Sequence, residues 1–300
     1  DGYTYRIFRH NPKDVASIRD NQINSIFEDP YGYIWIHTRQ GYSIYNPNLD
    51  RIENNSESAA KRLGLPDDDF TKVIKGKNGD YWIAHNRLGL VRYQSLTKKL
   101  IPISVDLLKE QDSAVDRSGI VSDFQENTKG DLWIVYADGM IGFIKSASHR
   151  ISKVSALFQK QNPGITSNHR IFVDQDDEPW IYTIKNTHGI FYYDHVGEKL
   201  ISGHTQSAVY RLTNNIISAM INGSDGKIWI GTDHGGINLL DKKNKTVTAL
   251  THNPDNGKSI SQNSITNLYK DSMGMIWVGT FKKGFLNYHP HIFKFSLVHH

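Results

Sequence analysis

The sequence predicts an all-β protein, a β-propeller built from four-stranded blades, on three observations. Its tryptophans recur at a near-constant spacing, each follows a tight-turn pattern, and short apolar runs flank every turn. A repeat of about 40 to 50 residues is typical of propellers and solenoids. No repeat shows the 3.6-residue period that an α-solenoid needs. The six tryptophans are Trp35, Trp82, Trp133, Trp180, Trp229 and Trp277, at intervals of 47, 51, 47, 49 and 48 residues.

A turn pattern precedes each tryptophan. An Asp or Asn at the start of such a turn caps it, and a glycine near its end adopts positive φ, so the pattern predicts a tight hairpin. Asp177 takes the glycine's place in the fourth repeat. The residue three before Trp is Gly32, Gly79, Gly130, Gly226 or Gly274, and the residue six before is Asp29, Asn127, Asp174, Asp271, Gly76 or Gly223.

Four apolar runs per repeat predict the strands of a blade. The runs Ile23–Phe27 and Ile34–Ile36 flank the first turn. Successive side chains of a strand point to opposite faces of the sheet, and in the tryptophan strand both sets are apolar. Both faces of the sheet should therefore be covered by neighbouring sheets. A third run follows a glycine and ends near Tyr45 in the first repeat. A fourth run follows it, for example KKLIPIS in the second repeat. Four strands in about 48 residues indicate a propeller blade.

The repeats run from end to end, so we expect residues 1–300 to form a single β-propeller domain. His10-Asn11-Pro12 and His252-Asn253-Pro254 each begin 25 residues before a tryptophan, so residues 1–9 correspond to the outer strand of a preceding blade. Residues 291–300 correspond to the outer strand of the last repeat and lead towards a next domain. Two closures stay open: a seven-bladed ring completed by upstream residues, which we favour, or six blades with one end free.

Two regions depart from the repeat. The long polar stretches between repeats have room for a helical turn, with residues 105–111 the best candidate. In the fourth repeat Pro179 precedes Trp180. Proline inside a blade strand suggests an edge position or a bulge.

Composition limits the function classes. The formal net charge is +4, from 35 Lys and Arg against 31 Asp and Glu, and no clustered basic patch indicates nucleic acid. Without cysteine, disulfides and thiolate metal sites are excluded. No run approaches the roughly 18 apolar residues of a membrane helix, so any membrane contact would come through a longer parent chain. The N-terminus shows no signal-peptide pattern.

Loops on one side of the blades supply the candidate ligand site. Antiparallel order alone places the loop after the tryptophan strand and the loop that enters the first strand on the same side of the propeller. Cationic, amide and carboxylate side chains there suit a hydroxyl-rich or anionic ligand, although loop tips are often merely solvated. The candidate ligand-binding residues are Arg39, His85, Arg87, Asp138, Lys185, His188, Asp233, His234, Lys282 and Lys283.

No catalytic residue, metal site or cofactor is predicted. Residues 174–178 resemble half a calcium loop, but they lack its glycine and distant glutamate and fall on the ordinary hairpin turn. Three of the histidines lie on candidate loops, yet no zinc-protease, nucleophile-elbow or nucleotide-binding motif is present.

The stretches NSITNLYKDSMGMIWVGT (263–280), NNIISAMINGSDGKIWIGTDHGGINLL (214–240) and NQINSIFEDPYGYIWIHTRQGYSIY (21–45) closely resemble the two-component regulator propeller repeat. That repeat builds the periplasmic sensor region of hybrid two-component systems. The resemblance implies a parent chain with tandem seven-bladed propellers, an immunoglobulin-like domain, one membrane helix and cytoplasmic kinase and regulator domains, working as a homodimer. It carries over no site residue.

The resemblance implies a non-enzymatic periplasmic domain that detects an oligosaccharide ligand to regulate polysaccharide utilisation. Basic residues in the candidate loops favour an acidic glycan. Two alternatives stay open: a lyase or hydrolase acting at the loop side of the propeller, and a scaffold for protein association or dimerisation.

Overall fold

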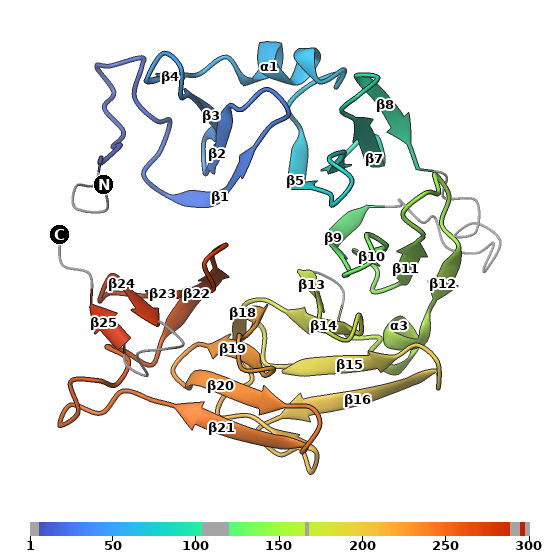
Figure 1. Cartoon of the computed structure of the whole chain (residues 1–300), viewed down its shortest axis with the longest axis vertical. Coiled ribbons are helices and arrows are strands. Elements are labelled where there is room, and N and C mark those ends of the chain that lie inside the picture. Colours follow the sequence, from blue (N-terminus) through green and yellow to red (C-terminus); the bar gives the residue numbers. More distant parts are fainter. Residues whose placement is uncertain (1–5, 104–119, 166–167, 289–294, 298–300) are drawn as a thin grey trace. The chain divides into compact units, whose positions relative to one another are not determined.

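A computed structural model describes residues 6–103, 120–165, 168–288 and 295–297. These residues form the blades of a β-propeller, as predicted: six sheets, each beginning with four antiparallel strands joined in chain order (Figure 1). The chain divides into two compact units, residues 1–104 with blades 1 and 2, and residues 105–300 with blades 3 to 6.

The strands of the first unit are short and evenly spaced. Blade 1 contains β1 (Ile23–Glu28), β2 (Ile34–Thr38), β3 (Gly41–Asn46) and β4 (Arg51–Glu53). Blade 2 contains β5 (Phe70–Lys75), β6 (Tyr81–His85), β7 (Gly89–Gln94) and β8 (Lys99–Pro102).

The second unit repeats this plan four times. Blade 3 contains β9 (Val121–Glu126), β10 (Leu132–Tyr136), β11 (Ile141–Ile144) and β12 (Lys153–Ser155). Blade 4 contains β13 (His169–Val173), β14 (Pro179–Thr183), β15 (Ile190–Asp194), β16 (Lys199–His204) and the parallel addition β17 (Tyr210–Arg211). Blade 5 contains β18 (Ile217–Asn222), β19 (Ile228–Thr232), β20 (Gly236–Asp241) and β21 (Thr246–Leu250). Blade 6 contains β22 (Ile265–Lys270), β23 (Ile276–Thr280), β24 (Phe285–Tyr288) and β25 (Phe295–Leu297).

The hydrophobic core lies between neighbouring blades of each unit. One cluster joins blades 1 and 2, and three further clusters join blades 3 and 4, 4 and 5, and 5 and 6. The repeated tryptophan supplies the contact: the Trp229 ring lies 5.0 Å from the ring of Tyr288 on the third strand of the next blade. Large aromatic side chains therefore hold successive blades together.

Coverage of both faces is confirmed for four of the blades. Every residue of the tryptophan strands β6, β10, β14 and β19 is buried. In β2 and β23 buried and half-buried residues are mixed, and Trp277 is half-buried. Apolar residues on both faces of the tryptophan strand thus predict correctly that both faces are buried, except in blades 1 and 6.

The predicted turn geometry is confirmed in all six repeats. The turn glycines have φ between +77° and +84°, and Asp177 adopts the same left-handed conformation at +67°. Non-glycine residues are disfavoured there, so Asp177 needs compensation. Its carboxylate accepts hydrogen bonds from the Thr128 backbone at 2.6 Å and hydroxyl at 2.8 Å, and lies 3.5 Å from Lys129 Nζ. Burial works against ionisation, but these contacts still hold the pKa of Asp177 below its usual value.

The aspartate at the start of the turn has a second role that its sequence position did not reveal. Asp29 Oδ1 accepts the backbone N–H groups of Tyr31 and Tyr33, while Oδ2 accepts the Trp35 indole N–H at 2.9 Å. The pairs Asp174–Trp180 and Asp271–Trp277 repeat this bond at 2.9 and 3.0 Å.

The expectation of an edge position or bulge at Pro179 is wrong. Pro179 is the first residue of β14, which lies between β13 and β15, and it pairs with Val173 in an unbroken register. Proline is tolerated as the first residue of a strand. The other five blades carry a register shift near the start of their first strand or the end of the second. Without this shift, β13 begins 11 residues before its tryptophan, whereas the first strand of each other blade begins 12 residues before its own.

The ends of the chain fit the expectation only in part. Residues 6–9 do not form the outer strand expected for 1–9, and residues 1–5 lie outside the described part. At the other end, β25 pairs with β24 as the expected fourth strand. Residues 105–111 also lie outside the described part. A single domain with six or seven blades stays a prediction.

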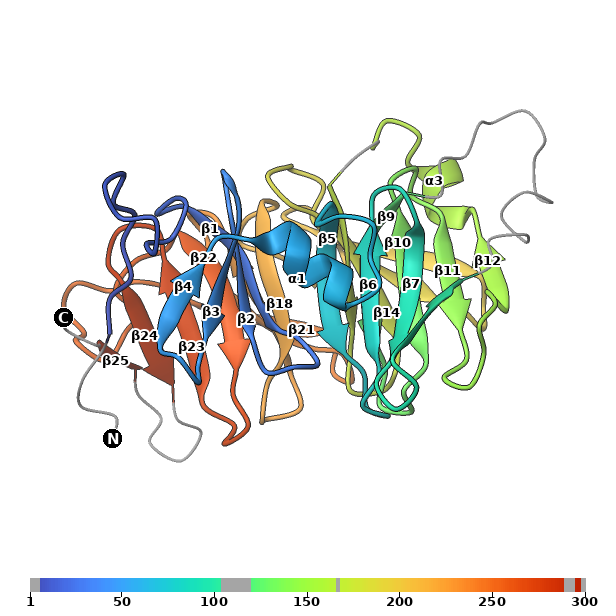
Figure 2. The same cartoon turned by 90° about the horizontal axis from the view of Figure 1, so that it is seen from above.

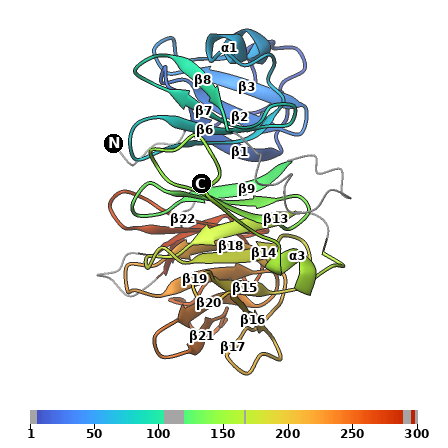
Figure 3. The ribbon, with the colours of Figure 1, turned by 90° about the vertical axis from the view of Figure 1, so that its right-hand side faces the viewer.

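Within the described residues, two short helices lie beside the sheets (Figures 2 and 3). Helix α1 (Ser56–Arg62) occupies the polar stretch after blade 1, where Asn55 caps it by accepting the Ser58 N–H at 3.3 Å. Its residues Ala59 and Ala60 join the core between blades 1 and 2. Helix α3 (Leu157–Gln161) buries Phe158 in the core between blades 3 and 4.

Candidate functional site

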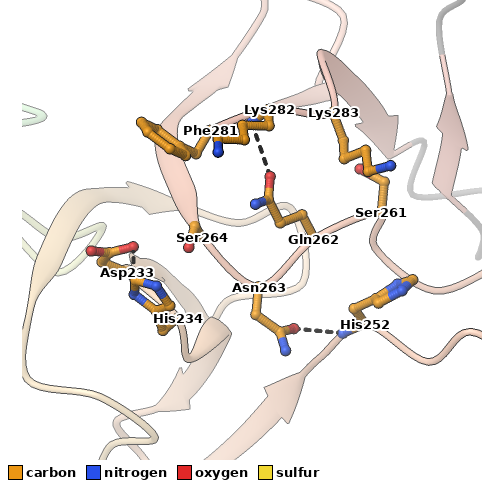
Figure 4. Close-up of a pocket in the computed structure, with 10 residues that line it drawn as sticks. All are labelled: Asp233, His234, His252, Ser261, Gln262, Asn263, Ser264, Phe281, Lys282 and Lys283. Atoms are coloured by element: carbon orange, nitrogen blue, oxygen red, sulfur yellow. Dashed lines mark hydrogen bonds and ion pairs between the residues drawn. The ribbon is translucent and has the colours of Figure 1, made fainter.

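A hollow of about 650 Å³, lined mostly by polar residues, lies between blades 5 and 6 of the second unit (Figure 4). Three loops form it: the β19–β20 loop, the segment that leads from β21 into β22, and the β23–β24 loop. Loops that antiparallel order places on one side of the blades do meet here. The lining residues are Asp233, His234, His252, Ser261, Gln262, Asn263, Ser264, Phe281, Lys282 and Lys283.

A threonine ends each of the two tryptophan strands beside the hollow, β19 and β23, and closes the loop that follows it. Thr232 Oγ1 donates to the Gly236 carbonyl at 2.9 Å, and Thr280 Oγ1 donates to the Gly284 carbonyl at 2.8 Å. Within the first of these loops, His234 has φ of +65°. An uncommon backbone conformation on a loop that borders a cavity is a reason to look for function there.

The segment from β21 into β22 is held by its own side chains. Asn263 Oδ1 accepts the His252 backbone N–H at 2.6 Å, and His252 Nδ1 lies 2.8 Å from the Ile260 carbonyl. A carbonyl only accepts, so Nδ1 carries a hydrogen and Nε2 is an acceptor in the neutral ring. The same contacts recur at His10, with Asn21 and Ile18, each at 2.8 Å. The His-Asn-Pro pattern thus marks a pre-shaped loop.

Hydrogen bonds join the loops around Gln262 and Asn263 (Figure 4). Gln262 Oε1 accepts the Lys282 backbone N–H at 3.0 Å. The Asn263 carbonyl accepts from Gly236 N at 2.8 Å, and the Ser264 carbonyl accepts from Phe281 N at 3.0 Å. Both neighbouring loops are therefore tied to the central segment, and the hollow is largely preformed.

The hollow combines cationic, acidic and aromatic groups. Lys282 and Lys283 are exposed, and Lys282 Nζ lies 5.5 Å from the centroid of the Phe281 ring. Phe281 is 65% exposed. Asp233 Oδ1 lies 2.9 Å from His234 Nδ1. With neutral histidines, the two lysines outweigh the one aspartate, so the lining has a positive formal charge.

The structure brings four of the ten predicted site residues together in this hollow: Asp233, His234, Lys282 and Lys283. Sequence analysis assigned His252 only to the recurring His-Asn-Pro pattern and missed Ser261. The recurrence of His-Asn-Pro was the available signal for His252.

The prediction for His85 is wrong, because its ring is buried inside its own loop. His85 Nδ1 accepts the backbone N–H groups of Arg87 and Leu88 at 3.1 and 3.3 Å. Its Nε2 lies 3.0 Å from Asp67 Oδ1 but is not aligned for a hydrogen bond. Burial lowers the pKa of His85. The ring stabilises the loop and presents no surface to a ligand.

The remaining predicted residues lie on other loops. Arg87 is exposed and forms an ion pair with Asp67. Asp138 Oδ1 accepts the Met140 N–H at 3.0 Å, as turn-forming aspartates do. Arg39 and Lys185 are exposed and His188 is half-buried. None of these residues lines the blade 5–6 hollow.

The acidic run at 174–178 is engaged by protein donors. Asp174 Oδ2 accepts from the Trp180 indole and lies 2.7 Å from Lys242 Nζ, which also lies 2.6 Å from Asp176 Oδ2. Across the described ranges, no group of three or more His, Asp or Glu side chains is arranged to hold a metal ion. Nor does that part of the chain contain a helix long and apolar enough to cross a bilayer.

Tryptophan-centred blades with loops gathered on one side define the class: a propeller built from sequence repeats. Three of these repeats, residues 17–40, 211–234 and 259–282, match the two-component regulator propeller model. These are the first, fifth and sixth repeats, and two of them contribute the hollow.

A curated relative is histidine kinase P4 of Formosa agariphila, 28% identical over 280 residues. The match covers 90% of this chain but only 19% of that kinase. The chain thus corresponds to about a fifth of the relative's length.

Two solved structures share the fold. The extracellular domain of a hybrid two-component system of Bacteroides thetaiotaomicron is 20% identical, with 99% of this chain and 39% of that chain covered and a TM-score of 0.52. A streptogramin B lyase is 15% identical, with 93% and 83% covered and a TM-score of 0.58. At these identities the likeness concerns the fold alone.

Proposed function

We propose that this chain is a non-enzymatic sensor propeller of a hybrid two-component histidine kinase and that it detects an oligosaccharide in the periplasm. The observation that carries the proposal is the match of three repeats to the two-component regulator propeller model. The extracellular placement of the B. thetaiotaomicron domain is consistent with a position outside the cytoplasm.

The chemistry of the hollow supports an oligosaccharide as the ligand. Its volume of about 650 Å³ falls within the roughly 300 to 1,000 Å³ of small-molecule sites. Gln262 offers an amide group, and His252 Nε2 offers an acceptor. A sugar needs such mixed donors and acceptors because its hydroxyl groups both donate and accept.

Signalling requires the ligand to distinguish two states of the parent protein. A ligand shifts an equilibrium only as far as its affinities for the two states differ. In this proposal the difference arises between this propeller and its partners in the parent chain, which are a second propeller and an immunoglobulin-like domain, or between the two protomers of a homodimer.

The competing hypothesis is a lyase or hydrolase. The Asp233–His234 pair, at 2.9 Å, is the observation that favours it, because a carboxylate beside an imidazole is a common arrangement for proton transfer. The two hypotheses differ in whether the bound glycan is consumed.

A binding experiment on the intact protein tests both. We expect calorimetric titration with uronate-containing, sulfated and neutral oligosaccharides to identify a ligand that is recovered unchanged by mass spectrometry and alters autophosphorylation. Cleavage of the bound glycan would instead support the enzyme. If no oligosaccharide class binds, the proposed ligand is wrong.

A further inference from the structure

We infer that the blade 5–6 hollow binds an anionic sugar unit, a pyranose bearing a carboxylate or sulfate, through the aromatic face of Phe281 and the ammonium groups of Lys282 and Lys283. This inference rests on the proposed function and specifies the site and the chemical class of its ligand.

Phe281 is placed as a platform. The residue is 65% exposed, although it directly follows the core strand β23. Its backbone N–H donates to the Ser264 carbonyl at 3.0 Å, so the segment that carries the ring is fixed. A fixed, exposed aromatic ring in a polar hollow offers the apolar C–H face of a sugar a surface to cover.

Lys282 adds charge beside this platform, and Lys283 adds a second positive charge to the lining of the hollow. Lys282 Nζ lies 5.5 Å from the ring centroid, so one ligand unit can meet the ring and the ammonium group together. Some basic side chains elsewhere in the protein form ion pairs with carboxylates. Arg87 pairs with Asp67, and Lys242 pairs with Asp174. Within the described ranges, Lys282 and Lys283 have no such ion-pair partner. Their charge is available to a ligand.

The only carboxylate in the lining does not cancel that charge. Asp233 lies 2.9 Å from the His234 ring, and His234 is held by its left-handed backbone. His252 Nε2 is an acceptor, because Nδ1 is engaged by the Ile260 carbonyl. The hollow thus pairs an anion-binding side with hydroxyl-binding acceptors, which suits an acidic sugar better than a simple anion.

The test compares three variants of the intact protein by calorimetry. They are Lys282→Ala/Lys283→Ala, Phe281→Ala, and the control Lys199→Ala/Lys243→Ala, which removes the same charge from exposed positions outside the hollow. The probes are trisaccharides of galacturonate and of mannuronate, a sulfated chondroitin tetrasaccharide, maltotriose, and inorganic sulfate. Thermal melting of each variant verifies that it is folded.

We expect an acidic probe to bind more tightly than maltotriose. The double lysine variant should lose about tenfold or more in affinity for that probe, together with much of the salt dependence. Phe281→Ala should weaken acidic and neutral probes alike, and the control should bind as the original protein does.

Three outcomes would overturn the inference. If a neutral glycan binds best, or the lysine variant binds the acidic probe unchanged, the anionic class or the hollow is wrong while the oligosaccharide sensor stands. If inorganic sulfate binds as well as the acidic glycans, the hollow is an anion site and not a sugar site. If no glycan binds the original protein, the proposed function itself fails.

Discussion

The carboxylate of Asp29 bonds simultaneously to the hairpin turn and to the indole of Trp35. Its Oδ1 accepts two backbone N–H groups at 2.8 and 3.0 Å, and its Oδ2 accepts the indole N–H at 2.9 Å. Both residues are almost fully buried, at 1% and 0% exposure. Because a carboxylate has two oxygens, one side chain satisfies the turn and the core donor together.

Replacing Asp29 by Asn should test this double role. The amide retains one acceptor for the turn but turns an N–H group towards the indole. We expect the free energy of unfolding to fall by about 1 to 3 kcal/mol, measured by urea denaturation. The third repeat already has this arrangement, because Asn127 replaces the aspartate and Trp133 Nε1 has no hydrogen-bond partner in the described structure. A matched change at exposed Asp255 should have almost no effect.

Asp177 offers a test of the left-handed turn position. Asp177→Ala loses the hydrogen bonds to Thr128 and keeps the strained φ of +67°. Asp177→Gly loses the same bonds but relieves the strain. The glycine variant should therefore be more stable than the alanine variant by about 1 kcal/mol. Equal stability would show that the backbone conformation costs nothing at this position.

Lys242 links blades 4 and 5 through two aspartates. Its Nζ lies 2.7 Å from Asp174 Oδ2 and 2.6 Å from Asp176 Oδ2, and the Asp174 side chain is only 2% exposed. Lys242→Met preserves the length of the side chain but leaves the buried carboxylate without its cation. We expect a loss of about 2 kcal/mol in thermal or urea unfolding. Lys243→Met, one residue along on the exposed face, should leave the unfolding midpoint unchanged.

His169 should make stability depend on pH. The ring is fully buried against Phe158, with Asp138 and His188 as its charged or titratable neighbours, and burial lowers its pKa. A lowered histidine pKa means that the unfolded chain binds more protons, so stability is complete above the unfolded pKa of about 6.5 and falls below it.

The measurement is the free energy of unfolding between pH 7.5 and 5. His169→Leu should make this profile less steep, and losses of the same sign should remain from His37 and His85, whose pKa values burial also lowers. Exposed His149→Gln should leave the slope intact. A variant at His169 that retains the full slope would assign the titration to another group.

Much of the fold is determined by residues that lie close together in the sequence, which is why sequence analysis predicted it. The positive-φ positions, the hairpins and the four strands per repeat follow from residues within one repeat of about 48 residues. The prediction at Pro179 was wrong because it considered only the neighbouring residues. Proline as the first residue of β14 needs no bulge, and the unbroken register between β13 and β14 shows that none is present.

The same reasoning predicted only part of the candidate site. Asp233, His234, Lys282 and Lys283 were identified because antiparallel order alone places their loops on one side of the blades. His85 belongs to an equivalent loop but turns inward, because two backbone N–H groups capture its Nδ1. The direction of a side chain within a loop depends on such hydrogen bonds in the folded protein. The spacing of residues in the sequence does not indicate it.

By itself the sequence determined the repeat, the blade and the side of the sheets on which the loops lie, because each follows from local periodicity and strand order. Only the tertiary structure decided which loops enclose a hollow, which aspartate oxygen meets an indole and which histidine is buried. Those outcomes depend on contacts between residues distant in the chain, where packing and hydrogen bonding select one arrangement among many that the local pattern permits.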